Sequence, residues 1–367
     1  MRDGVGIGII GCGNISSAYL KAAQEFDILD IRGLADMRPE AAQTRADEFG
    51  LRAMSIEEML ADPEIEIVIN LTIPRAHVEV GLQVLAAGKH VYSEKPLGIT
   101  FSEGQKLLKA ADAAGLRVGS APDTFLGGSH QTCRHLVDEG FLGTPVGGTA
   151  YFMCPGHERW HPDPAFYYDI GGGPILDMGP YYVTDLVNLY GAVESVVGIG
   201  TKVRNERTIT SQPRDGEKVP VKVATHVCGL LKFANGAVVQ MTMSFDVAGH
   251  KHVPLELYGT NGSMIVPDPN FFGGEISTLK TGGEWEDVPI SQPYSEANYR
   301  SIGVADMALA LRNNRPHRAN GALALHVLEV MEAFEKSSET GEAIQITTLV
   351  EKPAPFSESM SGGVLSK

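Results

Sequence analysis

Short aliphatic runs alternate with amphipathic segments from residue 5 to about residue 120. The aliphatic runs, such as VGIGII at 5–10, carry few polar residues, whereas the segments between them, such as PEAAQTRADEFG at 39–50, have apolar residues at helical spacing. This alternation predicts successive βαβ units around a parallel sheet that helices cover on both faces. We therefore expect a Rossmann-like α/β domain over residues 1–125.

After about residue 125 the pattern changes to longer runs in which polar and apolar residues alternate, as in THVCGLLKFANGAVVQMTMSFDV at 225–247. The Asn-Gly pairs at 235–236 and 261–262 lie between such runs and predict hairpins with primed turns, which need positive φ angles. Helices are expected near 129–140 and 178–190, and two more in the late segment, separated at Pro316 and ended at Gly341.

The second half therefore predicts an α+β domain over residues 126–350 with a large, open, mostly antiparallel sheet. The late helices are expected to pack back on the first domain. Residues 351–367 are assigned to a tail, and its small, polar last dozen residues, FSESMSGGVLSK, are expected to be loosely held.

The composition narrows the possible partners. The 367 residues carry a formal net charge of -15, which argues against a nucleic acid or an anionic membrane as partner. The four cysteines form no CxxC pair, so neither a zinc ribbon nor a disulfide framework is expected. The N-terminal residues do not resemble a signal peptide, and we find no run of about 18 apolar residues that would span a membrane. A cytoplasmic protein is expected.

A glycine-rich turn follows the first predicted strand. In GIIGCGNIS, Gly11 and Gly13 precede Ser16 at the spacing of a dinucleotide-binding fingerprint, with serine in the third glycine position. Asp36 closes the second predicted strand, where a carboxylate binds the adenosine ribose and repels a 2'-phosphate. NAD is therefore favoured over NADP, although Arg38 offers a charge that a 2'-phosphate could use.

Two further segments carry candidate chemistry. Lys95 follows the fourth predicted strand, where open α/β sheets bind ligands, and an ammonium there can donate to a substrate hydroxyl or carbonyl. Asp177, Tyr181 and Asp185 recur every four residues, so a helix beginning near Asp177 would present all three on one face. Alternatively, Asp177 caps that helix and the tyrosine packs in the core.

The ordered set GIIGCGNIS, Asp36, NLTIPRAH, GKHVYSEKPLG and GGGPILDMG resembles the Gfo/Idh/MocA family of nicotinamide-dependent oxidoreductases, from about residue 5 to about 345. The resemblance implies oxidation or reduction of a sugar, inositol or related polyol, with Lys95 as catalytic lysine and Asp177 as its partner. It also implies dimers or tetramers formed through the bare face of the second sheet. The cofactor-binding residues that the resemblance implies are Gly11, Gly13, Asn14, Ile15, Asp36, Arg38, Thr72, Pro74, His77, Glu94 and Lys95.

One position departs from the family pattern. The family often has histidine four residues after the aspartate as a proton-transfer residue, whereas this chain has Tyr181 there and Asp185 one place later than the usual acid. A tyrosine with a reference pKa of about 10 is a poor base near neutral pH unless a cation lowers that pKa. Tyr181 is therefore a candidate catalytic residue, and the identity of the general base stays open.

The segment HERWH at 157–161 matches the HExxH pattern of zinc proteases. Prolines at 155, 162 and 164 leave too little chain for the helix that this zinc site requires, so we expect no metal. These residues are assigned instead to the rim of a sugar-sized pocket. The expected substrate-binding residues are Lys95, Trp160, His161, Tyr168, Asp177 and Tyr181.

Two other classes of function stay open at this point. One is an NAD-dependent enzyme that cleaves glycosides by transient oxidation at C3, which would accumulate no net NADH. The other is a non-catalytic NAD-binding protein, which would not need Lys95 or Asp177. The nature of the sugar or polyol is not determined by the sequence.

Overall fold

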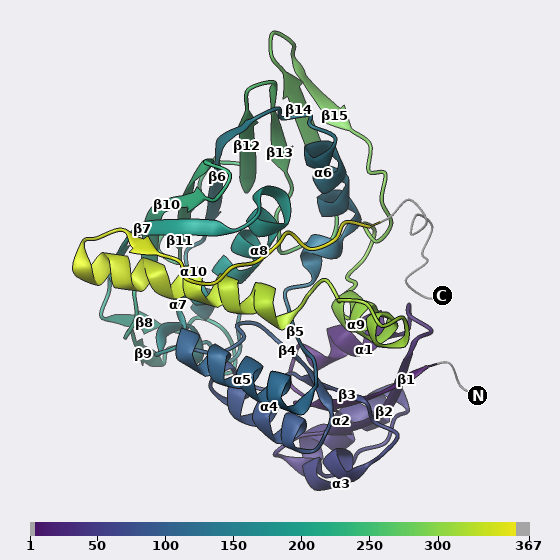
Figure 1. Cartoon of the computed structure of the whole chain (residues 1–367). Coiled ribbons are helices and arrows are strands. Elements are labelled where there is room, and N and C mark those ends of the chain that lie inside the picture. The colour runs from purple at the N-terminus through teal and green to yellow at the C-terminus, as the bar shows by residue number, and fades with distance from the viewer. Residues whose placement is uncertain (1–3, 357–367) are drawn as a thin grey trace.

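The computed structural model describes residues 4–356, which form two sheet domains, one below the other in Figure 1. The N-terminal domain lies at the bottom of that view, and the second domain lies above it. The helix α10 (Gly321–Thr340) runs along the boundary and contacts elements of both domains (Figure 1). Within residues 4–356, every helix is too short or too polar to cross a membrane.

Within residues 4–356, the first sheet has five parallel strands in the order β2-β1-β3-β4-β5, which confirms the predicted parallel fold. The strands are β1 (Val5–Ile10), β2 (Leu29–Ala35), β3 (Ile67–Asn70), β4 (His90–Ser93) and β5 (Val118–Ser120). All residues of β1, β3 and β5 are buried, as expected between two layers of helices. The strand order reverses between β1 and β3, so their carboxyl ends flank the crevice where such sheets bind ligands.

Five helices connect these strands: α1 (Ser16–Ala23), α2 (Pro39–Phe49), α3 (Ile56–Ala61), α4 (His77–Ala86) and α5 (Phe101–Ala114), counted within residues 4–356. The sequence prediction did not include α3. Its start carries a capping box, in which the Ser55 hydroxyl accepts from the Glu58 main chain and the Glu58 carboxylate accepts from the Ser55 main chain. This pattern is visible in the sequence and could have identified the helix.

Within the described residues, the second sheet has nine strands in the order β15-β14-β13-β12-β6-β11-β10-β7-β16. Only the β6–β11 pair among them is parallel, so the expected mostly antiparallel sheet is confirmed. Its strands are β6 (Pro145–Met153), β7 (Val193–Thr201), β10 (His226–Phe233), β11 (Val238–Ser244), β12 (Leu255–Gly259), β13 (Gly262–Val266), β14 (Ile276–Lys280), β15 (Trp285–Val288) and β16 (Ile344–Gln345).

The two faces of this second sheet differ. Alternate side chains of a strand point to opposite faces, so Val196 of β7 lies in the core beneath α10 while the neighbouring Val197 is exposed. The exposed face carries four aliphatic side chains on the adjacent strands β7, β10 and β11. These are Val197, Ile199, Leu230 and Val238.

Both Asn-Gly hairpins form, but the predicted primed turns do not. At the β10–β11 connection Gly236 has φ 91°, whereas Asn235 lies outside the positive-φ region. The Gly236 N–H donates to Phe233 O and the Phe233 N–H to Ala237 O, so three residues form the loop and glycine takes the left-handed position at its end. At the β12–β13 connection neither Asn261 nor Gly262 has positive φ, and Gly262 already belongs to β13.

The chain after the second sheet returns to the first domain. The helix α9 (Ile302–Arg312) contacts α1 and β5, and α10 contacts α5 and β5. Residues 351–356, assigned to the tail, are held against α6 (Gly128–Asp138). There Arg134 donates to Pro353 O at 2.8 Å, and the Phe356 N–H donates to the Gln131 side chain at 2.9 Å. Apart from Phe356, which is buried, the predicted loose tail lies outside the described residues.

Candidate active site

The glycine-rich turn joins β1 to α1 at the carboxyl edge of the first sheet. Gly11 has φ 103°, and a Cβ there would lie 2.6 Å from the Leu71 carbonyl, so only glycine fits. A Cβ at Gly13 would meet nothing within 4 Å, and the neighbouring Asn14 is exposed. Ile15 precedes the first turn of α1. The turn therefore has the open space beside a helix N-terminus that a dinucleotide pyrophosphate requires.

Asp36 follows β2 and faces this turn. One of its carboxylate oxygens accepts from the Cys12 N–H at 2.8 Å, and the other accepts from the Arg38 N–H at 2.9 Å. The Arg38 side chain is exposed, with Nε 3.8 Å from the Asp36 carboxylate. The charge of Arg38 is thus partly balanced by the acid that would bind the ribose hydroxyls.

The turn after β3 is built around His77, whose ring is fully buried. Its two ring nitrogens lie 2.7 Å from Pro96 O and 3.0 Å from Thr72 O, and burial lowers the pKa of its imidazole. His77 therefore ties the turn after β3 to the turn that contains Lys95, rather than facing the crevice as expected. Thr72 donates to the Asn70 side chain at 2.6 Å, and Pro74 begins a short 3-10 turn, Pro74–Ala76, beside it.

Glu94 and Lys95 follow β4 directly. The Glu94 carboxylate accepts from the Tyr19 hydroxyl at 2.7 Å and from the Lys95 N–H at 2.9 Å. Tyr19 lies on α1 and is buried, and no pattern in the sequence indicated this pairing. Glu94 thus holds the start of the lysine turn against α1, close to the glycine-rich turn where a cofactor would bind.

Lys95 reaches across the boundary between the domains to Asp177. Its Nζ donates to Asp177 Oδ1 at 2.8 Å and to Asp177 O at 2.6 Å. Burial lowers the pKa of the lysine, but the charge and hydrogen bond of Asp177, together with Tyr181 and Glu94, outweigh this effect and the pKa lies above its usual value. Burial raises the pKa of Asp177, but the charge of Lys95 and a bond from His157 hold it well below its usual range. The lysine is thus an ammonium and its partner a carboxylate.

The helix expected near 178–190 is confirmed, but Asp177 is not part of it. Asp177 is the last residue of α7 (Gly173–Asp177), and α8 (Gly179–Tyr190) begins two residues later with Pro180 in its first turn. Asp185 points elsewhere, because its carboxylate lies 2.8 Å from His130 Nδ1 in a fully buried pair. Asp177 and Tyr181 nevertheless both contact Lys95, which the fourfold spacing alone would not have shown.

Tyr181 presents its ring, rather than its hydroxyl, to the lysine. The Lys95 Nζ lies 5.0 Å from the ring centroid, within the range of a cation–π interaction. Its hydroxyl accepts from the Arg300 guanidinium at 3.5 Å, and that guanidinium lies 5.9 Å from the same centroid. Tyr181 is therefore held between two cations. Arg300 was not identified from the sequence, where nothing distinguishes it from other arginines that precede a helix.

His157 supplies the imidazole that the family pattern would place at position 181. Its Nε2 lies 3.0 Å from Asp177 Oδ2, and Trp160 Nε1 donates to its Nδ1 at 3.1 Å. An indole N–H can only donate, so Nδ1 must accept and the proton resides on Nε2. His157 is consequently a neutral donor to Asp177. The sequence drew attention to this residue only through the HExxH pattern.

The HExxH segment forms a single 3-10 turn, His157–Arg159, instead of a helix. Its Glu158 lies apart from the two histidines and pairs with Arg207 at 2.8 Å, while also accepting from the Tyr168 hydroxyl. Among residues 4–356, no group of three His, Cys, Asp or Glu side chains could hold a metal ion. Glu158, the acidic residue of the HExxH pattern, is therefore held by contacts with Arg207 and Tyr168 within the protein.

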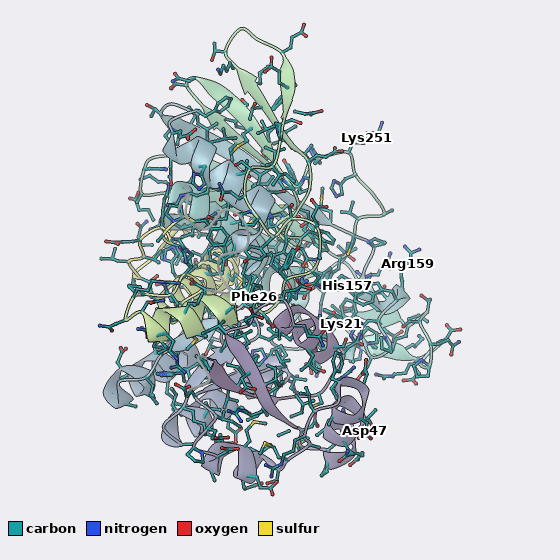
Figure 2. All side chains as sticks on the ribbon, turned by 90° about the vertical axis from the view of Figure 1, so that its right-hand side faces the viewer. Lys21, Phe26, Asp47, His157, Arg159 and Lys251 are labelled. Carbon is teal, nitrogen blue, oxygen red and sulfur yellow. The ribbon has the colours of Figure 1, made fainter. Side chains whose placement is uncertain are left out.

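The expected substrate-binding residues of this segment differ in exposure. Trp160 is 59 % exposed, and the partly buried His161 packs edge-on against Trp160 and Tyr167. Tyr168 is fully buried in a small core with Phe245, so it supports the loop instead of lining a pocket, contrary to expectation. In Figure 2, His157 lies at the level between the two domains, with Arg159 farther out.

Comparisons with known proteins agree with this architecture. Residues 5–121 match the model of an oxidoreductase family with an NAD-binding Rossmann fold, and residues 130–265 match the Gfo/Idh/MocA C-terminal domain. The chain is 24 % identical to 1,5-anhydro-D-fructose reductase of Ensifer adhaerens, over 93 % of this chain and 98 % of that protein. It is 25 % identical to levoglucosan dehydrogenase of Pseudarthrobacter phenanthrenivorans, over 71 % of this chain and 72 % of that protein.

A solved structure shares the fold over nearly the full length. Levoglucosan dehydrogenase in complex with NADH superposes with a TM-score of 0.83 and 20 % identity, covering 94 % of this chain and 100 % of that one. At this level of identity the similarity shows the fold alone.

Proposed function

The chain belongs to the Gfo/Idh/MocA family of oxidoreductases, and from this premise we propose that it transfers a hydride between NAD(H) and a secondary alcohol or ketone of a sugar or polyol. The relatives named above act on sugar derivatives, and the first domain has the dinucleotide-binding Rossmann fold. The observation that carries the proposal is the contact between Lys95 and Asp177. It sets an ammonium beside the carboxyl ends of the dinucleotide-binding strands, at the boundary with the second domain.

In the proposed mechanism a bound nicotinamide supplies the hydride chemistry, and the protein supplies orientation and proton transfer. The Lys95 ammonium binds the reacting oxygen and, in the reductive direction, donates its proton to that oxygen. Asp177 stabilises the ammonium, and neutral His157 fixes the second oxygen of the Asp177 carboxylate. Tyr181 covers the other side of the lysine with its ring, which excludes water from the ammonium.

We assign the cofactor as NAD in preference to NADP. The Asp36 carboxylate lies at the end of β2, where it would accept from ribose hydroxyls and repel a 2'-phosphate. The exposed Arg38 lies near that same carboxylate, which reduces the positive charge available to a phosphate.

We further propose that two copies associate through the open face of the second sheet. The exposed aliphatic residues Val197, Ile199, Leu230 and Val238 on its adjacent strands support this assignment, since monomers seldom expose such patches. Light scattering on the protein and on a variant with Ile199→Lys would test it, with loss of the dimer expected in the variant.

The central experiment is a screen of sugars, inositols and glycosides with NAD and NADP, and of the corresponding ketones with NADH, followed by absorbance of the reduced cofactor. A simple dehydrogenase gives a net, stoichiometric change in NADH. Release of a leaving group without net NADH would instead indicate the glycoside-cleaving reaction. Absence of both, with cofactor bound, would contradict the proposal.

A further inference from the structure

Arg300 carries a guanidinium of the active site that forms no ion pair within residues 4–356, although the more distant carboxylates of Glu94 and Asp123 act on its charge. It is partly buried, and no carboxylate of residues 4–356 lies within 4.0 Å of it. Its side-chain hydrogen bonds within the described residues all come from one nitrogen, which donates to Asn270 Oδ1 at 2.8 Å, to Asn270 O at 3.3 Å and to the Tyr181 hydroxyl at 3.5 Å. Nε and the second terminal nitrogen therefore keep their donors for another group.

The buried arginines elsewhere in the described chain are different. Each lies against at least one carboxylate, because a desolvated charge without a counter-charge is costly. The pairs are Arg134 with Asp138, Arg207 with Glu158 and Asp246, and Arg318 with Asp306. By this comparison, Arg300 is arranged to receive an anion from outside the chain.

The guanidinium also lines a hollow of the second domain. Its walls come from two segments, residues 270–273 and 295–298, and its volume is about 430 Å³, which lies in the range of small-molecule sites. Glu296 lines the hollow too, but its side chain is exposed and accepts from the Ser295 hydroxyl at 3.2 Å. The interior charge of the hollow is that of Arg300.

Arg300 and the proposed reacting group both contact Tyr181. Lys95 and Arg300 lie 5.0 and 5.9 Å from the centroid of the one Tyr181 ring. Lys95 is paired with Asp177, whereas Arg300 has no carboxylate within 4.0 Å among residues 4–356, so a ligand that reaches both side chains meets one paired cation and one without an ion pair. Such a ligand would place a hydroxyl at the lysine and a second group at the arginine.

We propose that Arg300 binds an anionic group of the substrate, a carboxylate or a phosphate, so that the enzyme acts on an acidic sugar or polyol rather than on a neutral one. This inference rests on the proposed function and specifies its substrate class. The free guanidinium donors fit an anion with two oxygens, which a guanidinium binds through parallel hydrogen bonds. Lys95 would hold the hydroxyl that is oxidised.

The test compares acids with their neutral parents. Uronates, aldonates and sugar phosphates are assayed with NAD beside the matching neutral sugars and polyols, and the carboxylate and phosphate arms show which anion is used. We expect the best acid to exceed its neutral parent in kcat/KM. In Arg300→Gln we expect kcat/KM for that acid to fall about 10- to 100-fold, the scale of a charged hydrogen bond, with little change for the neutral parent.

A second variant tests whether the charge of Arg300, and not a general loss of folding, accounts for the preference for acidic substrates. Asn270→Asp keeps the shape of the residue but gives Arg300 an internal carboxylate, so the preference for acids should disappear while turnover of neutral parents persists. Arg32→Gln, at a surface ion pair with Asp30 and Glu64, is the matched control and should behave as the unmodified enzyme.

Two results would overturn the inference. One is turnover of neutral sugars that exceeds turnover of every acid, which leaves the proposed function intact. The other is an Arg300→Gln variant that weakens NADH binding and both substrate types equally, which would place the arginine at the cofactor. If no compound on the panel is turned over, the proposed function fails. Calorimetric titration of the NADH-bound enzyme with the same acids then decides the role of Arg300, and equal binding by the enzyme and Arg300→Gln overturns the inference.

Discussion

The Lys95 ammonium donates to both the carboxylate and the main-chain carbonyl of Asp177, at 2.8 and 2.6 Å, although the first residue follows a strand of the Rossmann sheet and the second ends a helix of the other domain. A movement of one domain against the other would break both bonds. In the proposed mechanism the Lys95 ammonium is correctly placed only when the two domains keep this relative position, so we expect catalysis to depend on the interface between the domains.

Replacement of the lysine should abolish turnover but not cofactor binding. In Lys95→Met we expect kcat to fall by about 10²- to 10⁴-fold, the usual contribution of a positioned acid or base, because no proton donor then faces the substrate oxygen. Titration of NADH fluorescence should give nearly the same Kd for the variant. The control is Lys21→Met, on the exposed side of α1. Turnover that survives in Lys95→Met would contradict the assigned role.

Removal of the aspartate charge should shift the pH profile. Asp177 makes the largest contribution that opposes the effect of burial on the pKa of the Lys95 ammonium. In Asp177→Asn only the smaller contributions of Tyr181 and Glu94 oppose burial, so this pKa falls. The reductive reaction needs the ammonium, and its kcat/KM should therefore decline from a pH at least about one unit lower than in the unmodified enzyme. An unchanged profile of kcat/KM against pH would show that another group donates the proton.

The tautomer of His157 gives a third prediction. His157→Gln keeps an N–H that can reach Asp177, whereas His157→Ala removes it, so we expect the glutamine variant to retain much more kcat than the alanine variant. Trp160→Phe keeps the aromatic surface but removes the donor to Nδ1, so the tautomer that presents Nε2–H to Asp177 is no longer fixed and we expect kcat to fall. Equal kcat for glutamine and alanine variants would argue against the positioning role.

Cofactor selectivity should respond to Asp36. In Asp36→Ala the carboxylate no longer repels a 2'-phosphate, and Arg38 loses its neighbouring counter-charge. We expect the ratio of kcat/KM for NADP to that for NAD to rise by about one to two orders of magnitude, the scale of one charged contact. The double variant Asp36→Ala, Arg38→Ala should lose most of that gain. If both variants keep the original ratio, the two residues do not contact the ribose.

Two buried histidines should make the fold sensitive to acid. Burial lowers the pKa of both His317 and His326 to about 4, and neutral His326 accepts from the Val193 N–H at 3.0 Å. Both pKa values are lower in the folded than in the unfolded protein. The contribution of the two neutral histidines to the free energy of unfolding is therefore fully present above the unfolded pKa of about 6.5 and is lost as pH falls towards 4.

Urea unfolding as a function of pH measures this effect. Between pH 6 and 4.5 these two histidines contribute a loss of about 2.7 kcal/mol per pH unit, to which other buried histidines such as His77 add. In His326→Gln the slope should be less steep by about 1.4 kcal/mol per pH unit, whereas the exposed His250→Gln should leave it unchanged. An identical slope in all three proteins would show that the histidines do not couple to folding.

Local sequence was sufficient for the elements of the fold that depend on periodicity and on single residues. The buried runs around Val5–Ile10 and Ile67–Asn70 predicted the parallel sheet, and Gly341 correctly marked the end of α10, where it takes φ 73°. The Asn-Gly pairs correctly predicted the two hairpins, but the predicted turn types are wrong, because the neighbouring strands decide which residue takes the left-handed position. Periodicity predicted the helix near 178–190, which is α8, but the sequence prediction did not include the short helix α7 that ends at Asp177.

By itself, the sequence determined the order of strands and helices, the glycine-rich turn, the lysine at a strand end and an acid to accompany it. Each of these depends on the conformational preferences of a few residues that are neighbours in the chain. Only the tertiary structure decided which side chains meet. In the folded protein His157 contacts Asp177, Asp185 pairs with His130, and Tyr168 is buried. Arg300 contacts Tyr181 and forms no ion pair within residues 4–356. Such contacts join residues far apart in the chain, and their energies depend on burial and geometry that no local pattern records.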